Sequence, residues 1–441
     1  MKRLISILML LSSIPVISYV FYGCTTPPGT DSKSVQLSIN KQISEWREEN
    51  RTGVSAETGL LKSWPENGPE LMWTNQDLPM GYSSVSIGNN TIYVTGNEKG
   101  NDVLVAINAD GTTKWKTVYG RAWTGASPES RCTPTVEVDK VYVSSGNGDL
   151  ACVDGNTGSI IWSLKASETF KGTYGDWGIA ESLLIDGDKL YFTPGGSETT
   201  TIAVNKNTGE LIWKSGSIND GPAYVSPILI DYAGKKMIVN VSLRHVFAVD
   251  ASNGAIIWKI KHTDSLDARK STVIWPDAPL IKCVTPLYHE GKIYVTGGYD
   301  HGGLMLNLTD SGNNVAVAWT DTVLDVHHGG VVLLDGYIYG ANWLNNSNGN
   351  WCCIEWNTGK KMWEEHWKCK GSIISAEGLL YIYDEKSGYV GLVRPGPEKF
   401  DLISSFKVSE GNGPHWAHPV INNGNLYIRH GKALMVFNIK K

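Results

Sequence analysis

An all-β fold, built from a unit of four short strands that recurs along the chain, is what this sequence predicts. A motif recurs as "CVDGNTGSIIW" at 152–162, "AVNKNTGELIW" at 203–213, "AVDASNGAIIW" at 248–258 and "CIEWNTGKKMW" at 353–363. Each copy follows two apolar alternating segments, as "SPILID" and "KKMIVNV" precede the third copy. The chain also holds 17 Trp, 19 Tyr and 48 Gly, a composition that favours strands and tight turns.

The N-terminus predicts export and a membrane anchor. A charged start and an apolar run over residues 4–20 precede Gly23 and Cys24, which is the pattern of a secretory signal. The run is near the lower limit for a bilayer span, so a short membrane anchor is the alternative. The stretch "FYGC" resembles a bacterial lipobox, whose Cys is acylated. We expect residues 1–23 to be the signal peptide and residues 24–44 to be lipidated Cys24 with a flexible tether. The mature protein is then secreted across the inner membrane of a bacterium, where it is lipid-anchored and faces the periplasm or lies at the outer membrane.

The residues that end each unit set the period of the repeat. Steps between them run from 42 to 61 residues, and a four-stranded unit of this period is typical of a β-propeller. The unit that begins at His415 holds three strands, and the lone strand "PELMWT" at 69–74 supplies the fourth. We therefore predict an eight-bladed β-propeller of four-stranded antiparallel blades over residues 45–441, whose last blade is closed by an N-terminal strand. The unit-ending residues are Trp73, Trp115, Trp162, Trp213, Trp258, Trp319, Trp363 and, in the same place, Phe406.

The motif has a physical reading. Gly158, Gly209, Gly254 and Gly359 lie at the turn between the third and fourth strands, where a positive φ is cheap for Gly alone. The Trp that follows lies on the outer strand, and we expect it to pack between neighbouring blades.

These repeats resemble the Trp-docking repeats of the quinoprotein (PQQ-like) propeller family over about residues 45–441. The stretches "LDVHHGGVVLLDGYIYGANW" and "GPHWAHPVINNGNLYIRHG" are similar to polyvinyl-alcohol-dehydrogenase-like proteins, and size and lipobox resemble the propeller lipoprotein of the Bam complex. For an enzyme, the resemblance implies PQQ with Ca²⁺ at the channel mouth, a catalytic Asp and adjacent disulfide-bonded cysteines. Cys352 and Cys353 invite that comparison, but adjacent strand residues point to opposite faces, so we expect structural thiols.

Aromatic and imidazole side chains are predicted to gather at one mouth of the propeller. In this fold the loops that enter first strands and those that join second to third strands open on one face, whereas His289 lies on the other. Such groups around a concave mouth suit a sugar, a polyol or a planar cofactor, and imidazoles that titrate near neutrality imply binding that changes between about pH 5.5 and 7.5. The candidate ligand-binding residues are Trp177, Tyr224, His301, His327, His328, Trp343, His415 and His418.

The sequence leaves three functions open. The first is a monomeric, membrane-anchored scaffold that binds a small molecule, sugar or polyol, or membrane-associated protein partners. The second is a PQQ-dependent alcohol or polyol dehydrogenase, and the third is a cofactor-free carbohydrate-active enzyme that uses the histidines. The net charge of −5 and the absence of a basic run beyond the first residues exclude nucleic acid as an expected partner. No C-x-x-C pair supports a metal site.

Overall fold

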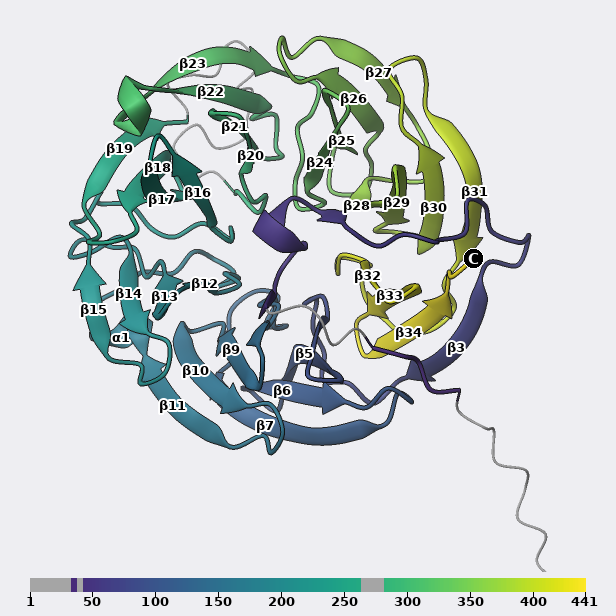
Figure 1. Ribbon diagram of the computed structural model, residues 1–441, viewed down its shortest axis with the longest axis horizontal. Coiled ribbons are helices and arrows are strands. Elements are labelled where there is room, and N and C mark those ends of the chain that lie inside the picture. Colours follow the sequence, from purple (N-terminus) through teal and green to yellow (C-terminus); the bar gives the residue numbers. More distant parts are fainter. Residues whose placement is uncertain (1–32, 38–42, 263–280) are drawn as a thin grey trace, which may run out of the picture. The chain divides into compact units, whose positions relative to one another are not determined.

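Among the described residues of the computed structural model, eight sheets, each built around an antiparallel blade, follow one another around a ring (Figure 1). The structure describes residues 33–37, 43–262 and 281–441, so the predicted signal peptide, Cys24 and most of the tether lie outside the described residues. Each sheet contains a four-stranded blade whose strands are consecutive in sequence, except that the last blade takes its outer strand from the N-terminal part of the chain. The predicted all-β, eight-bladed propeller is therefore confirmed.

Blades 1 to 4 are formed by successive strands between residues 86 and 261. Blade 1 comprises β4 (Ser86–Gly88), β5 (Thr91–Glu98), β6 (Asn101–Ile107) and β7 (Thr113–Arg121). Blade 2 comprises β8 (Thr135–Glu137), β9 (Lys140–Ser144), β10 (Asp149–Asp154) and β11 (Ile160–Lys165), followed by the short helix α1 (Ala166–Thr169). Blade 3 comprises β12 (Leu184–Asp186), β13 (Lys189–Phe192), β14 (Ile202–Asn205) and β15 (Leu211–Lys214). Blade 4 comprises β16 (Ile228–Tyr232), β17 (Lys235–Val241), β18 (His245–Asp250) and β19 (Ile256–Lys261).

Blades 5 to 8 complete the ring. Blade 5 comprises β20 (Leu287–His289), β21 (Lys292–Thr296), β22 (Gly303–Thr309) and β23 (Asn314–Asp321), with a 3-10 turn at Asp310–Gly312. Blade 6 comprises β24 (Val331–Leu334), β25 (Tyr337–Ala341), β26 (Trp351–Glu355) and β27 (Lys361–Glu365). Blade 7 comprises β28 (Gly371–Ala376), β29 (Leu379–Asp384), β30 (Tyr389–Arg394) and β31 (Asp401–Lys407). Blade 8 comprises β32 (Val420–Asn422), β33 (Asn425–His430), β34 (Ala433–Asn438) and the N-terminal β3 (Glu70–Asn75).

Strand β3 closes the ring as the sequence predicts. It pairs antiparallel with β34, and Trp73 lies opposite Val436. Figure 1 shows β3, near the N-terminal end of the colour scale, as the outermost strand of the yellow blade 8. The first and last parts of the propeller are thus joined in one sheet, which leaves no open strand edge between them.

The apolar core is divided among the gaps between blades. Each of the eight clusters of buried apolar residues joins two neighbouring blades, for example blades 2 and 3 or blades 8 and 1. Outer-strand Trp side chains lie in these layers, and the motif glycine of the next blade packs on them. A Cβ added at Gly158, whose φ is +76°, would lie 2.8 Å from the Trp115 ring. The predicted packing of Trp between blades is confirmed, and it explains the Gly-to-Trp spacing.

Blade 7 departs from the predicted register. Cys353 of blade 6 lies opposite Trp363, but the matching position of blade 7 places Leu392 opposite Ser404. The prediction that Phe406 occupies the Trp position is therefore wrong by two residues. Phe406 still packs against the next blade, because a Cβ added at Gly68 would lie 2.7 Å from it. Trp64 packs on the Phe406 ring, with ring centroids 5.1 Å apart. Two aromatic rings fill the space that the small Ser404 leaves.

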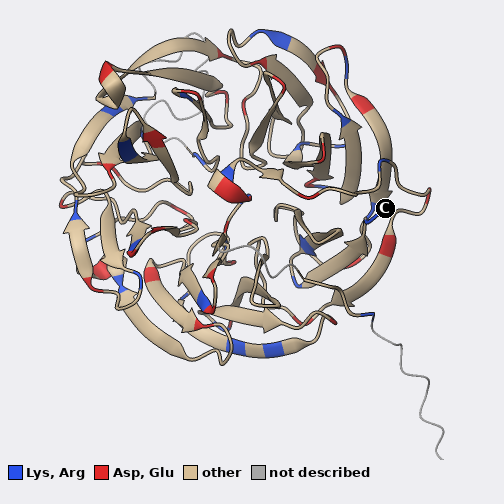
Figure 2. Ribbon diagram, in the orientation of Figure 1, with Lys and Arg blue, Asp and Glu red and all other residues tan. Residues whose placement is uncertain are grey.

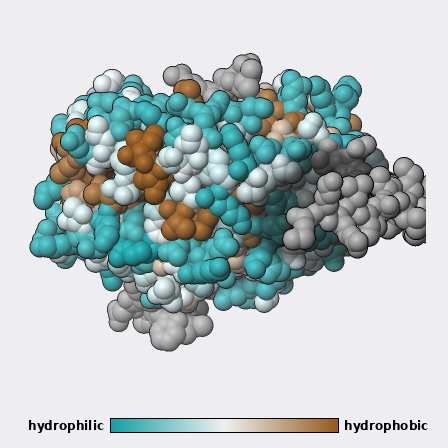
Figure 3. Space-filling model, turned by 90° about the horizontal axis from the view of Figure 1, so that it is seen from below, coloured by the Kyte–Doolittle hydropathy of each residue, from teal (hydrophilic) through white to brown (hydrophobic). Residues whose placement is uncertain are grey.

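The outside of the ring is mainly polar. Figure 2 shows Lys, Arg, Asp and Glu mostly on outer strands and turns, with a further group on the segment at the centre of the ring. Figure 3 shows hydrophobic areas that interrupt the hydrophilic side surface. Exposed aliphatic side chains on outer strands include Ile160 and Ile161 of β11 and Leu211 and Ile212 of β15. Within the described residues, none of the helices has the length and apolar character that a bilayer span requires.

Candidate ligand-binding site at the mouth of the propeller

A segment that belongs to no blade crosses the centre of the ring, and we call residues 43–55 the central segment (Figure 1). It begins with β1 (Ile43–Ser44), which pairs with β8 of blade 2, and the Ile87 amide of blade 1 donates to the Ser44 hydroxyl. After a 3-10 turn at Glu49–Arg51 it ends with β2 (Val54–Ser55), which runs parallel to β28 of blade 7. Both ends are thereby attached to inner strands of the propeller.

Three side chains of the central segment connect it to the remaining blades. Arg51 is 2% exposed and donates to the carbonyl oxygens that precede the first strands of blades 3 and 4, those of Leu183 and Pro227, both at 2.8 Å. The Trp46 indole donates to Thr285 of blade 5 at 3.2 Å.

Arg47 supplies the last contacts of the central segment. It donates to Val331 O of blade 6 at 2.5 Å and to Ile373 O of blade 7 at 3.0 Å, and its Nη1 lies 2.8 Å from His418 Nδ1 of blade 8. Together with the strand pairings, these bonds give the central segment a contact in every blade.

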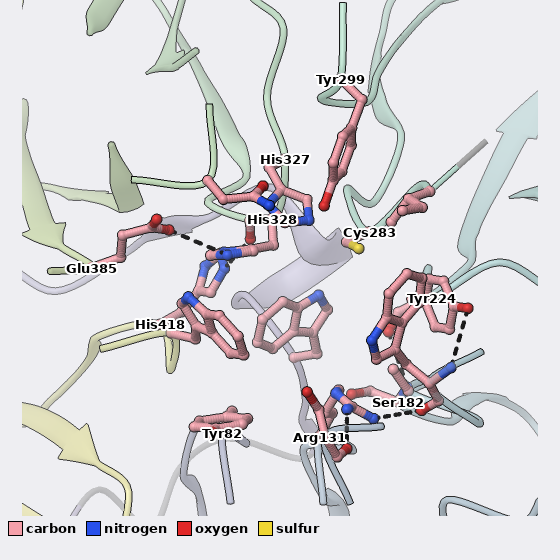
Figure 4. Close-up of a pocket in the computed structure, with 18 residues that line it drawn as sticks. Tyr82, Arg131, Ser182, Tyr224, Cys283, Tyr299, His327, His328, Glu385 and His418 are labelled. Atoms are coloured by element: carbon pink, nitrogen blue, oxygen red, sulfur yellow. Dashed lines mark hydrogen bonds and ion pairs between the residues drawn. The ribbon is translucent and has the colours of Figure 1, made fainter. Parts of the chain in front are cut away.

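A cavity of about 370 Å³ lies at one mouth of the propeller (Figure 4), and we call it the mouth pocket. Every blade contributes to its lining, and the central segment contributes Trp46. Apart from Trp46, the lining residues come from the two loop classes that the sequence analysis places on one face. Its lining is Trp46, Tyr82, Ser127, Arg131, Trp177, Ala180, Ser182, Tyr224, Ser226, Ile281, Cys283, Tyr299, His327, His328, Asn346, Glu385, Trp416 and His418.

Five of the eight predicted ligand-binding residues line the mouth pocket, and their binding of a ligand stays a prediction. These five are Trp177, Tyr224, His327, His328 and His418.

The other three predicted residues do not line the pocket. Trp343 packs against the lining residue Tyr299, with the two rings tilted by 34° and their centroids 4.7 Å apart. His415 is buried, with Nδ1 2.5 Å from the Tyr383 hydroxyl. His301 is partly buried, and burial lowers its pKa to about 4.

Both ring nitrogens of His418 form hydrogen bonds within the protein. Its Nδ1 accepts from Arg47, so its Nε2 carries the proton and donates to His328 O at 2.9 Å. Burial, with the neighbouring Arg47 charge, holds the pKa of His418 well below its usual range. Gly329 and Gly330, which follow the His327–His328 pair, leave no room for a ligand beside it, because a Cβ at Gly330 would lie 2.2 Å from Arg47 Nη1 and one at Gly329 would lie 1.8 Å from Gly371 O. Protein atoms occupy both spaces.

His327 and His328 form the polar part of one wall together with Glu385. The two imidazole centroids are 4.4 Å apart, and His328 Nε2 lies 3.2 Å from Glu385 Oε2. The other carboxylate oxygen of Glu385 pairs with the buried Lys370 ammonium at 2.5 Å.

These imidazoles are neutral at pH 7. Burial, with the Lys370 charge, lowers the pKa of His328 to about 3, and burial holds the pKa of His327 well below its usual range. The expected pH dependence between about 5.5 and 7.5 from these histidines is therefore wrong, since the structure removes them from the range where a free imidazole titrates.

Several residues that sequence reasoning missed are central to the site. Trp46 comes from "SEWREENR", a charged stretch outside every repeat, and that isolation was the available signal. Tyr82 packs edge-on against Trp416 with centroids 4.8 Å apart, and Arg131 lies between Tyr82 and Tyr224 in Figure 4. The loops that carry these residues differ in length and sequence, so no repeat pattern marks them.

PQQ with Ca²⁺ does not fit the donors of the mouth pocket. PQQ carries several carboxyl groups, whereas Arg131 is the one Lys or Arg side chain among the lining residues. Within the described ranges, no group of three or more His, Cys, Asp and Glu side chains is placed to hold a metal ion. Cys352 and Cys353 are free, buried thiols in the clusters on opposite sides of blade 6, so the predicted structural role is confirmed.

Eight four-stranded blades with Trp–Gly docking between them define the class of PQQ-like β-propellers. Comparison with protein families gives the particular family: residues 99–365 match the PQQ-like family described as outer membrane protein assembly factor BamB. This chain belongs to that family.

Curated relatives fall into two groups. Proteins named outer membrane protein assembly factor BamB from Yersinia pestis and Moranella endobia are 24% and 20% identical over 325 and 290 residues. These matches cover 66% and 63% of this chain and 72% and 68% of the relatives. A quinoprotein ethanol dehydrogenase of Pseudomonas aeruginosa is 24% identical over 200 residues, which cover 40% of this chain and 32% of that protein. The chain thus spans about a third of the dehydrogenase that it matches.

Solved structures agree on the fold. BamB from Moraxella catarrhalis superimposes with a TM-score of 0.57 at 14% identity, covering 84% of this chain and 99% of that one. The quinohemoprotein alcohol dehydrogenase from Comamonas testosteroni gives a TM-score of 0.64 at 12% identity, covering 89% and 79%. At these identities the likeness establishes the shared propeller and carries no function.

Proposed function

We propose that this chain is a membrane-tethered scaffold of the bacterial envelope that holds a protein partner on the face of the mouth pocket. Membership of the family described as an outer membrane protein assembly factor supports a role among proteins that work at a membrane. Cys24, in the lipobox-like "FYGC", supplies the tether in this proposal, and the outer membrane is its expected location.

The mouth pocket is the observation that carries the proposal. Aromatic side chains and a guanidinium, the groups enriched at interaction hot spots, line one concavity to which all eight blades contribute. A rigid ring that presents such a concavity suits recognition, because the lining residues are already ordered before a partner arrives.

Two enzyme hypotheses have less support. The donors around the mouth pocket do not suit PQQ and Ca²⁺, as described above. A cofactor-free acid–base mechanism needs an imidazole with a pKa near the working pH, whereas His418 has both nitrogens engaged and His328 has a pKa of about 3.

A matched pair of photo-crosslinking positions tests the scaffold proposal. Leu344 lies in the β25–β26 loop near the pocket and is 48% exposed, whereas Val138 lies in the β8–β9 turn of the opposite loop class and is 64% exposed. A photoreactive amino acid at each position, in intact cells, is expected to give an adduct with an envelope protein, identified by mass spectrometry, at Leu344 alone. Adducts confined to Val138, or none at either position, would overturn the proposal.

A further inference from the structure

Arg131 is partly buried and differs from the fully buried guanidinium groups of this protein. Arg47 and Arg429 are sealed inside the structure and engaged with several oxygen or nitrogen acceptors, and Arg51 pairs with Glu45 at 3.1 Å. Arg131 lines the mouth pocket instead, and its protein partners are two main-chain carbonyl groups, Trp177 O at 2.7 Å and Ser127 O.

The positive charge of Arg131 has no close carboxylate. Within the part of the chain that the structure describes, no carboxylate oxygen, including those of Glu129, lies within 4.0 Å of its guanidinium nitrogens. A guanidinium has five N–H donors, and the protein uses two of them here. A partly buried cation with free donors is costly unless a ligand completes it, and a carboxylate matches its fork geometry with two parallel hydrogen bonds.

The surroundings of Arg131 define the rest of the ligand. Two edge-to-face aromatic pairs, Tyr82 with Trp416 and Trp177 with Tyr224, line the pocket on either side of it, with centroids 4.8 Å and 5.6 Å apart. Figure 4 shows His327, His328 and Tyr299 on the wall opposite Arg131. That wall offers uncharged groups and the Glu385 carboxylate, which is already paired with Lys370, so it supplies no free cation for a second negative charge on the ligand.

We propose that the mouth pocket binds a monocarboxylate that carries a flat ring, with the carboxylate on Arg131 and the ring among the aromatic side chains. This inference rests on the proposed function, because the scaffold and the carboxylate ligand are assigned to the same mouth of the propeller. It adds the chemical class of ligand that the mouth recognises. Two sources share this chemistry, a free aromatic acid and the end of a peptide whose last residue is aromatic.

Isothermal titration of the purified full-length protein tests the proposal with paired probes. 4-Hydroxyphenylacetate is compared with its neutral amide, and N-acetyl-Gly-Phe with its C-terminal amide. Each acid is expected to bind at least about 10-fold more tightly than its amide, the lower end of what charge-assisted hydrogen bonds contribute. A peptide source is indicated where the dipeptide binds more tightly than the small acid, and a free acid where the order is reversed.

Variants locate the binding. Arg131→Gln is expected to bring the acid down to the affinity of the amide, while Arg131→Lys, which keeps the charge, retains part of the preference. Arg394→Gln is the matched control, since this exposed guanidinium pairs with Asp401 away from the pocket. Should Arg131→Gln fail to fold, Trp416→Leu serves instead and is expected to weaken acid and amide equally.

Three outcomes overturn the proposal. These are no binding of either acid by the wild-type protein at millimolar concentration, equal affinity for acid and amide, and undiminished acid binding in folded Arg131→Gln. The crosslinking at Leu344 is independent of these titrations. Loss of adducts with intact acid binding removes the scaffold proposal alone, and adducts without acid binding remove this inference alone.

Discussion

Replacing Arg47 by Met tests whether the central segment stabilises the propeller. The change removes hydrogen bonds to Val331 O, Ile373 O and His418 Nδ1, which belong to three different blades. Each buried acceptor left without a donor costs about 1–3 kcal/mol. Relief from burying the guanidinium offsets part of this, because burial lowers the pKa of Arg47 to about 10, which corresponds to about 3 kcal/mol. With three acceptors at a middle value of about 2 kcal/mol each, less this relief, a net loss of about 3 kcal/mol in the free energy of unfolding is expected.

Denaturation by urea, followed by circular dichroism, measures that loss, with Arg394→Met as the surface control. The control replaces an exposed partner of Asp401 and is expected to change stability by less than about 0.5 kcal/mol. A second readout is local. Arg51 is 2% exposed and therefore protected from trypsin in the native protein, and release of the central segment in Arg47→Met should allow trypsin to cut after it. Equal stability of the two variants, with Arg51 still protected, would refute the role assigned to the central segment.

Three further predictions concern closure, charge burial and the anchor. Deleting residues 1–75 is expected to lower the melting temperature far more than deleting 1–40, because the longer deletion removes β3 and the central segment. Loss of the buried Trp73 side chain alone costs about 3–5 kcal/mol. Equal melting temperatures of the two deletions would contradict ring closure by β3. Burial raises the pKa of Glu181 from 4.5 to about 8. The stability that the protonated form contributes is therefore full below pH 4.5 and is lost as the pH rises through 8. Glu181→Gln should stabilise the protein by about 3–5 kcal/mol at pH 9 and little at pH 4, and equal gains at the two pH values would contradict the raised pKa. Cys24→Ser is expected to abolish incorporation of labelled fatty acid, and labelling that persists excludes Cys24 as the acylated residue.

Local pattern was sufficient to predict the blades. A turn glycine and an outer-strand Trp at constant spacing report contacts between consecutive units, and those contacts recur because each blade docks on the one before it. The missing fourth strand of the last unit and the unpaired strand at 69–74 likewise predicted how the ring closes, and the pairing of β3 with β34 bears this out. The sequence pattern did not predict the register of blade 7, because Phe406 matches the spacing of the motif although Ser404 occupies the Trp position.

The mouth of the propeller was predictable in part. Strand order alone assigns each loop to a face, which is why Trp177, Tyr224, His327 and His328 were expected at the mouth and do line the pocket. Whether a given loop residue points into the pocket depends on loop conformation, and His415 turns instead toward Tyr383. The repeat pattern does not predict the orientation of such side chains, because the residues that they contact are distant in sequence.

The sequence by itself determined the class of fold, the number of blades, the closing strand and the face on which the candidate residues lie, because all of these follow from local periodicity and strand order. Only the tertiary structure placed the central segment among all eight blades and removed His327, His328 and His418 from the neutral titration range. It also left the Arg131 guanidinium with no carboxylate of the described residues within 4.0 Å. These properties arise from burial and from contacts between residues hundreds of positions apart, such as Arg47 with His418. Desolvation depends on what surrounds a group in space, and a linear pattern does not record it.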